Sequence, residues 1–229
     1  MKSGLPCDRE PPATFFVHQP KHDVAEPDTL LIVIDAQRAF VDPAGTLALA
    51  YGLDEVQPCV TALERLRTYL RHCSADTRVL FVRSEYRPGQ FAEGRLDHPL
   101  SDLCVPGRNV DCDWAVGLDT TRASTIITKQ QTDAGETAAY RVVIERALRD
   151  GTRQIVFAGF QLTTCVSASA LTTMGLVRGY GTRVVVAEAL AGARASSYVL
   201  TATGSRVEAA RCELRAAGVL VSHGIEHDA

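Results

Sequence analysis

Six short apolar segments rich in β-branched residues recur along the chain, and this recurrence is what most restricts its fold. They occupy residues 30–34 (LLIVI), 78–82 (RVLFV), 124–128 (STIIT), 154–158 (QIVFA), 183–187 (RVVVA) and 219–222 (VLVS). A continuous run of this kind is typical of a strand that is buried on both faces. Helical patterns lie between these segments, so we expect an α/β protein with three α/β/α layers and a doubly wound, six-stranded parallel sheet.

Helix signals are clearest in three places. Asp54 is suited to cap a helix whose apolar face recurs at helical spacing from Val56 to Leu70. A second helix is expected over residues 136–151, with Gly151 as its stop, and a third over residues 205–218, ending at Gly218. Residues 84–122 have no periodicity and are too long for a simple connector, which indicates a functional loop region.

Length and composition indicate one globular domain. The chain has 229 residues, of which 46% are hydrophobic and 22% charged, enough for a single α/β core. Residues 1–28 are rich in proline and polar side chains, so we interpret them as an extended N-terminal arm and residues 29–229 as the folded domain.

Charge and cysteine usage restrict location and partners. The net charge is −3 and the basic residues are spread out, which disfavours nucleic-acid binding. No apolar run is long enough to cross a bilayer, and the N-terminal residues lack the apolar core of a secretory signal. Seven cysteines without a CxxC pair are typical of reduced thiols, so we expect a cytoplasmic protein.

Polar side chains follow three of the predicted strands. Asp35 follows the first, Lys129 the third, and Cys165 the fourth, after a turn led by Gly159. The carboxyl ends of parallel strands meet at one edge of a sheet, where ligands bind. A lysine and a helix N-terminus favour a thiolate, a carboxylate exchanges the thiol proton, and backbone N–H groups at the turn stabilise an oxyanion.

Each of these residues also has a simpler interpretation. Cysteine is often a small core residue, aspartate after a strand often stabilises a turn, and a lone lysine is usually solvated. The functional hypothesis therefore depends on all three residues falling at strand ends of one βαβ array.

The segments LLIVIDAQRAF, TIITK, IVFAGFQLTTCVSASA and GYGTRVVVAEALA, in this order, resemble the isochorismatase-like cysteine hydrolases. That superfamily includes nicotinamidases, N-carbamoylsarcosine amidases, ureidoacrylate and biuret amidohydrolases, and isochorismatases. The resemblance covers residues 29–192. It implies the strand order 3-2-1-4-5-6 and a catalytic triad of Asp35, Lys129 and Cys165, with Cys165 as the nucleophile.

The resemblance also implies several finer features. The peptide bond between Phe160 and Gln161 corresponds to a cis bond of the family, and the oxyanion hole corresponds to the backbone N–H groups of Gln161 and Cys165. The family forms dimers or tetramers, so we expect a homodimer or homotetramer, with the N-terminal arm free to wrap a neighbour. No cofactor is expected.

Departures from the family pattern concern the metal site and the substrate pocket. Nicotinamidases carry an Asp-x-His metal motif after the second strand, where this chain has Ser84 and Tyr86, so we predict no metal. True isochorismatases lack the cysteine nucleophile, so Cys165 favours cleavage of a C–N bond. The substrate-binding candidates are Gln37, Phe40, Arg83, Tyr86, Arg87, Arg108, Trp114 and Thr164.

Three functions remain open at this stage. The first is a cysteine amidohydrolase that acts on a small amide, carbamoyl or ureido compound through a thioester-type acyl-enzyme. The second is an isochorismatase-type vinyl ether hydrolase in which Asp35 is the acid and Cys165 is incidental. The third is a non-catalytic binding protein on the same fold.

Overall fold

Six parallel strands form one sheet in the order β3-β2-β1-β4-β5-β6, as the sequence analysis predicts. The structure is a computed structural model that describes residues 28–74 and 77–222; the predicted arm, residues 1–27 in particular, lies outside these ranges. The strands are β1 (Thr29–Ile34), β2 (Arg78–Ser84), β3 (Thr125–Lys129), β4 (Gln154–Phe160), β5 (Arg183–Gly192) and β6 (Leu220–Ser222).

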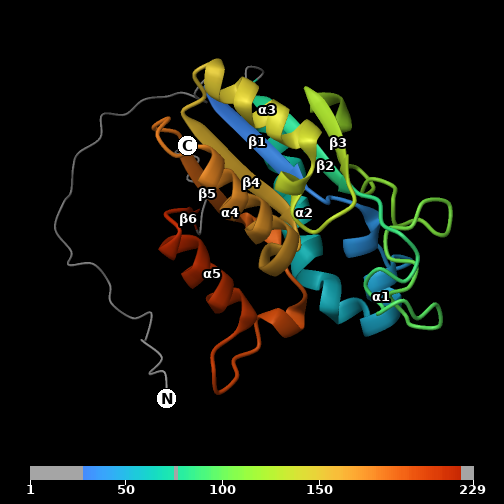
Figure 1. Cartoon of the computed structure of the whole chain (residues 1–229). Helices are drawn as coiled ribbons and strands as arrows, with labels where there is room; N and C mark the ends of the chain where they lie inside the picture. Colours follow the sequence, from blue (N-terminus) through green and yellow to red (C-terminus); the bar gives the residue numbers. More distant parts are fainter. Residues whose placement is uncertain (1–27, 75–76, 223–229) are drawn as a thin grey trace.

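Five helices cover the two faces of the sheet (Figure 1). They are α1 (Thr46–Tyr51), α2 (Leu53–His72), α3 (Ala138–Arg149), α4 (Ser167–Leu176) and α5 (Arg206–Ala216). Helices α3, α4 and α5 pack on one face, and α1 and α2 lie against the other, which completes the three predicted layers.

The central strands separate two cores. Every residue of β1 is buried, and its side chains alternate between the faces: Ile32 and Ile34 contact the α3–α5 side, whereas Leu31 and Val33 contact the α1–α2 side. The apolar stripe of α2, which includes Leu63 and Leu66, fills the second core. A β-branched strand at the centre of the sheet is therefore buried on both faces, as its composition predicts.

Local details differ from the predictions at the element ends. The N-cap of α2 is Gly52 rather than Asp54. Asp54 lies in the first turn, where its carboxylate interacts favourably with the positive end of the helix dipole. Helix α1 has no predicted counterpart, because its six residues are too few to show a helical period. Ser205 caps α5 in a capping box with Glu208, and α3 ends before Gly151, as predicted.

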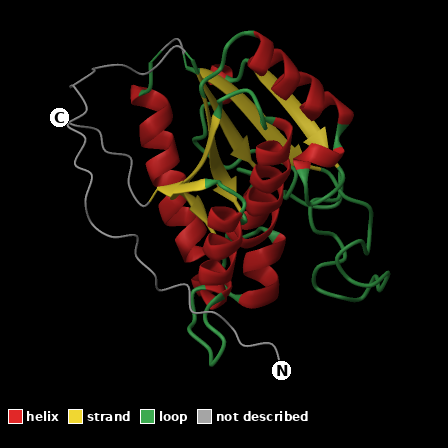
Figure 2. Ribbon diagram, turned by 60° about the vertical axis from the view of Figure 1, so that its left-hand side comes forward, coloured by secondary structure: helices red, strands yellow, loops and turns green. Residues whose placement is uncertain are grey.

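The long segment between β2 and β3 has no strand or α-helix among its described residues and ends in a short 3-10 turn, Thr120–Arg122. In Figure 2 the longest green loops lie together on the right of the view, beyond the strands. This confirms that the segment is irregular; its functional role stays a prediction.

The described residues bear on two further expectations. None of their helices combines the length and apolarity that a bilayer span requires. Among the described cysteines, Cys59, Cys73, Cys104, Cys112 and Cys165 are free thiols.

Candidate active site

The carboxyl ends of β1, β2 and β3 bring three polar side chains together. Asp35 follows β1, Ser84 ends β2 and Lys129 ends β3, and Ser84 pairs with Lys129 in the strand register. Asp35 continues the ladder through its N–H, which donates to the carbonyl of Val82 at 2.8 Å, and then leaves it with a left-handed φ of 50°. The parallel register therefore places all three side chains side by side.

The three side chains form a fully buried polar network. Lys129 Nζ lies 2.9 Å from Asp35 Oδ2, and both side chains have 0% exposure. Lys129 Nζ also donates to Ser84 Oγ at 2.7 Å, and Ser84 Oγ donates to Asp35 Oδ1 at 2.9 Å. Asp35 Oδ2 has this charge contact but accepts no well-aligned hydrogen bond within the described residues, so one carboxylate oxygen is free to accept a proton.

Tyr86 connects the network to Cys165. Its hydroxyl lies 2.6 Å from Ser84 Oγ, 3.1 Å from Lys129 Nζ and 3.8 Å from Cys165 Sγ. The Tyr86 backbone N–H donates to the Cys104 carbonyl, and its ring packs edge-on against Phe91. The hydroxyl is thereby fixed between the charged pair and the sulfur.

Burial and neighbouring charges set the protonation of these groups. Burial, reinforced by the charge of Asp35, raises the pKa of Cys165 to about 11, although Lys129 and Tyr86 act in the opposite direction. Burial alone lowers the pKa of Lys129, but the charges of Asp35 and Cys165 outweigh it, and the pKa is raised. The resting site therefore holds an ammonium and a protonated thiol at neutral pH. Lys129 favours the thiolate, as the sequence analysis expects, but burial and the charge of Asp35 outweigh its effect.

The turn after β4 presents Cys165 at the base of a helix. The peptide bond between Phe160 and Gln161 is cis. Gly159 has a φ of 102°, and a Cβ at this position would overlap the carbonyl oxygen of Ile34, so only glycine fits where β4 meets the end of β1. A π-helical turn, Leu162–Val166, then precedes α4. Such turns occur frequently at functional sites.

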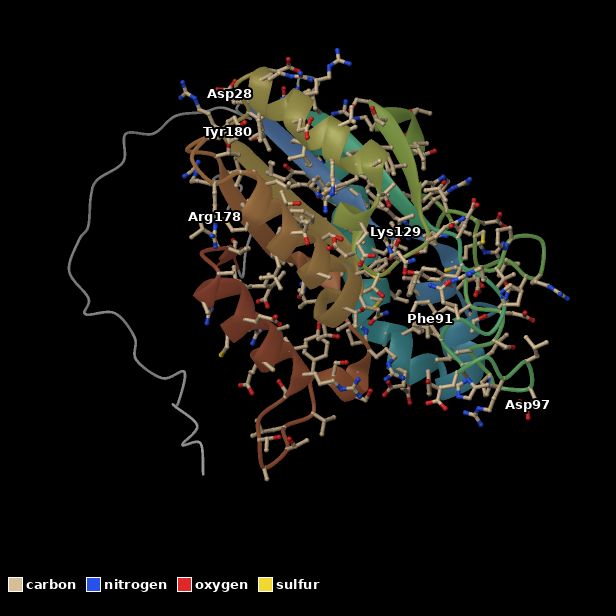
Figure 3. All side chains as sticks on the ribbon, in the orientation of Figure 1. Asp28, Phe91, Asp97, Lys129, Arg178 and Tyr180 are labelled. Carbon is tan, nitrogen blue, oxygen red and sulfur yellow. The ribbon has the colours of Figure 1, made fainter. Side chains whose placement is uncertain are left out.

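A cavity of about 190 Å³ opens over Cys165. Its lining is mostly apolar, with one charged side chain, Arg194, whose guanidinium stacks on the Tyr51 ring at 4.3 Å. The lining residues are Phe40, Leu47, Tyr51, Tyr86, Phe91, Leu100, Leu103, Thr132, Gln161, Thr164, Cys165 and Arg194. In Figure 3, Phe91 and Lys129 are labelled at the same end of the molecule, beside the long loops. An apolar cavity near 150 Å³ accommodates benzene, so this one suits a ligand about the size of a substituted single ring.

The structure divides the predicted substrate-binding residues into two groups. Phe40, Tyr86 and Thr164 line the cavity. The other candidates do not line it; they are Gln37, Arg83, Arg87, Arg108 and Trp114.

The residues outside the cavity have other surroundings. Gln37 is fully buried and exchanges hydrogen bonds with the Ser84 backbone, which makes it a support of β2. Arg83 pairs with Glu85 at 2.6 Å, and the partly buried Trp114 packs edge-on against the core residue Phe81. Arg87 and Arg108 are exposed. A sequence motif shows that a residue is near a strand end, but not which way its side chain points.

Two site residues escaped the sequence analysis as functional groups. Ser84, considered only as a non-ligand, bridges Asp35 and Lys129; as the last residue of β2, it satisfies the same strand-end rule that identified Lys129. Arg194 comes from the segment after β5, and its N–H donates to Gln161 Oε1 at 2.8 Å. No spacing signal in the sequence connects Arg194 to the cavity.

The described residues contain no group of three or more His, Cys, Asp or Glu side chains arranged to hold a metal ion. At the position of the nicotinamidase motif, Ser84 and Tyr86 instead belong to the hydrogen-bond network. The absence of a metal requirement stays a prediction.

A parallel α/β sheet with a carboxylate, an ammonium and a thiol at its carboxyl edge defines a candidate hydrolase site. The sequence matches the isochorismatase domain model over residues 29–209. The chain therefore belongs to the isochorismatase family, whose members are hydrolases.

Solved structures share the fold at low sequence identity. PnC1 from L. infantum, in complex with nicotinate, is 19% identical, with a TM-score of 0.63, over 87% of this chain and 94% of its own. A nicotinamidase/pyrazinamidase from Acinetobacter baumanii is 16% identical, with a TM-score of 0.63, over 86% and 97%. N-carbamoylsarcosine amidase from Thermoplasma acidophilum is 16% identical, with a TM-score of 0.60, over 87% and 99%. Among curated proteins, none matches this sequence.

Proposed function

We propose that the protein is a cysteine-dependent amidohydrolase that cleaves a C–N bond of a small amide, carbamoyl or ureido compound. The observation that carries the proposal is the cluster of Asp35, Lys129 and Cys165: Cys165 lines the cavity, and the charges of the buried Asp35–Lys129 pair act on its thiol. The likeness to solved amidase structures supports the fold, whereas the side chains of the site support the class of reaction.

The proposed first step is attack by the sulfur. Asp35 Oδ2 takes the proton of the Cys165 thiol while the sulfur forms a bond to the substrate carbonyl carbon. The carbonyl π electrons move to oxygen, and the backbone N–H groups of Gln161 and Cys165 are proposed to stabilise this oxyanion. Because the resting thiol is protonated, the thiolate forms only as it is consumed.

Collapse of this intermediate releases the amine. The carbonyl reforms, the C–N bond breaks, and the nitrogen takes the proton held by Asp35. Asp35 then deprotonates a water molecule, whose oxygen attacks the thioester carbon. The C–S bond breaks, the acid is released, and Asp35 returns the proton to the sulfur. Lys129 keeps its positive charge throughout and offsets the negative charge that passes between Asp35, sulfur and oxyanion.

Cavity size and lining support a small, largely neutral substrate. Its volume of about 190 Å³ suits a small molecule, and the aromatic and aliphatic wall favours an apolar or planar group beside the amide. Thr132, Gln161 and Thr164 supply the polar lining.

The test is a panel of small primary amides, carbamoyl amino acids and ureido acids, with ammonia release as the readout. The wild type should hydrolyse at least one, and Cys165→Ala should lose at least ~10³-fold in kcat/KM while remaining folded. Cys73→Ala, at a free thiol beyond the end of α2, is the matched control. Near-normal hydrolysis by Cys165→Ala would overturn the covalent mechanism and favour acid chemistry by Asp35.

A further inference from the structure

We propose that Tyr86 is a fourth catalytic residue, whose hydroxyl donates a hydrogen bond to Cys165 Sγ when the thiolate forms. The inference rests on the proposed function and deepens it. It is carried by the position of the Tyr86 hydroxyl, within reach of the sulfur, the ammonium of Lys129 and the hydroxyl of Ser84.

The proton inventory decides which way the Tyr86 hydroxyl points. Lys129 is an ammonium and has no acceptor, so its contact of 3.1 Å makes the Tyr86 oxygen an acceptor. The Ser84 proton is within reach of the Tyr86 oxygen, at 2.6 Å, as well as of Asp35 Oδ1, so the single Tyr86 proton is directed to Cys165 Sγ, at 3.8 Å. In the resting site the sulfur carries its own proton, so this contact is weak.

Proton transfer to Asp35 strengthens the contact between Tyr86 and the sulfur. The ionised carboxylate attracts the Ser84 proton to Oδ1, at 2.9 Å. Once Oδ2 is protonated, Oδ1 becomes a weaker acceptor, and the Ser84 proton turns toward the Tyr86 oxygen. The Tyr86 oxygen then accepts from both Ser84 and Lys129, and its own proton is held toward the sulfur, which now carries the negative charge. A rotation of the Ser84 hydroxyl therefore couples the protonation of Asp35 to the donor at Sγ, with no proton transfer between the hydroxyls.

The surroundings keep the Tyr86 hydroxyl in this role. Tyr86 is 4% exposed, and its ring packs on Phe91 with centroids 4.6 Å apart. Burial and the charges of Asp35 and Cys165 raise its pKa well above the usual value, so the hydroxyl keeps its proton as a donor. The hydrogen bond from Tyr86 also favours the ionised form of Cys165. A donor of this kind assists both thiolate formation and the later departure of the sulfur from the thioester.

The test compares Tyr86→Phe, which removes the hydroxyl and keeps the ring, with Tyr140→Phe. Tyr140 is a fully buried tyrosine in the other core, and its hydroxyl pairs with Thr173 Oγ1 at 2.6 Å. Tyr140→Phe therefore controls for the loss of a buried tyrosine hydroxyl away from the cavity. Iodoacetamide labelling of Cys165 is followed from pH 6 to 10 by peptide mass spectrometry, because other free thiols are present.

Tyr86→Phe should slow alkylation of Cys165 about tenfold at pH 8–9, and its apparent thiol pKa should rise; Tyr140→Phe should match the wild type. Asp35 and Lys129 also face the sulfur, so the apparent pKa belongs to the group as a whole. In hydrolysis, Tyr86→Phe should lower kcat about tenfold with little change in KM.

Wild-type alkylation by Tyr86→Phe would overturn this inference even if hydrolysis is found. A change confined to KM would instead make Tyr86 a substrate-binding residue. If the wild type hydrolyses no amide but Tyr86→Phe still slows alkylation, the proposed function fails and the contact between Tyr86 and the sulfur stands.

Discussion

The two ends of the parallel sheet hold ion pairs of the same chemistry in opposite surroundings. At the carboxyl end, Lys129 and Asp35 lie 2.9 Å apart with no exposure. At the amino end, Arg78 pairs with Asp150 at 3.1 Å and Arg153 with Asp28 at 3.2 Å, and all four side chains are 32–76% exposed. Figure 3 labels Asp28 and Lys129 at these opposite ends.

The difference shows where the fold tolerates a costly arrangement. Exposed ion pairs contribute little to the free energy of unfolding, because water screens their charges and their long side chains lose conformational freedom. The buried pair loses its hydration and is maintained by additional hydrogen bonds: Ser84 Oγ donates to Asp35, and Lys129 Nζ donates to the Tyr86 hydroxyl and the Gln131 carbonyl. A buried, charged group that stability alone does not require is expected at a functional site.

The largest stability effect should come from breaking the buried pair. Lys129→Met leaves Asp35 as an uncompensated charge and should lower the free energy of unfolding by about 3–5 kcal/mol. Arg78→Met, at the exposed pair, should lower it by at most about 1 kcal/mol. Urea titrations of the two variants measure the contrast. Equal losses would show that burial does not distinguish the two ends.

A smaller effect should appear at alkaline pH. The pKa of Cys165 is raised from about 9 in the unfolded chain to about 11 in the fold. Between these values the unfolded chain binds fewer protons, so the free energy of unfolding falls as pH rises from about 9 to 11, and the contribution is fully present below pH 9. Between about pH 9 and 11, the free energy of unfolding should fall by about 2 kcal/mol less in Cys165→Ala than in the wild type.

Thermal or urea unfolding at pH 8, 9, 10 and 11 measures the slope. Other buried groups, including Cys59, with a pKa of about 12, give both proteins a common background. Identical slopes for the wild type and Cys165→Ala would show that the thiol titrates alike in both states.

The fold was largely predictable from the sequence because β-branched runs mark central strands directly. All six strands fall where such runs occur, and the order of the sheet follows from the family resemblance. Short elements such as α1 and the continuation of β5 through a register shift to Gly192 were not predictable, because they depend on tertiary contacts.

The site was predictable only in part. The strand-end rule identifies Asp35, Lys129 and Cys165, because the chain position fixes the sheet edge they reach. It does not reveal which loop side chains turn inward: Trp114 packs against the core residue Phe81, whereas Arg194, far along the chain, reaches the cavity. The resting protonation of Cys165 was also not predictable, because the loss of hydration on burial outweighs the nearby lysine.

The most direct test of the central claim, that Asp35 exchanges protons with Cys165, is to compare two rates in Asp35→Asn. The negative charge of Asp35 raises the pKa of Cys165, so its removal should speed iodoacetamide alkylation of Cys165 at pH 8. The same change removes the base and acid of the reaction, so hydrolysis of the amide substrate should fall by at least ~10²-fold. Opposite movement of the two rates is the predicted result. Hydrolysis at the wild-type rate, or an equal fall in both rates, would contradict the account.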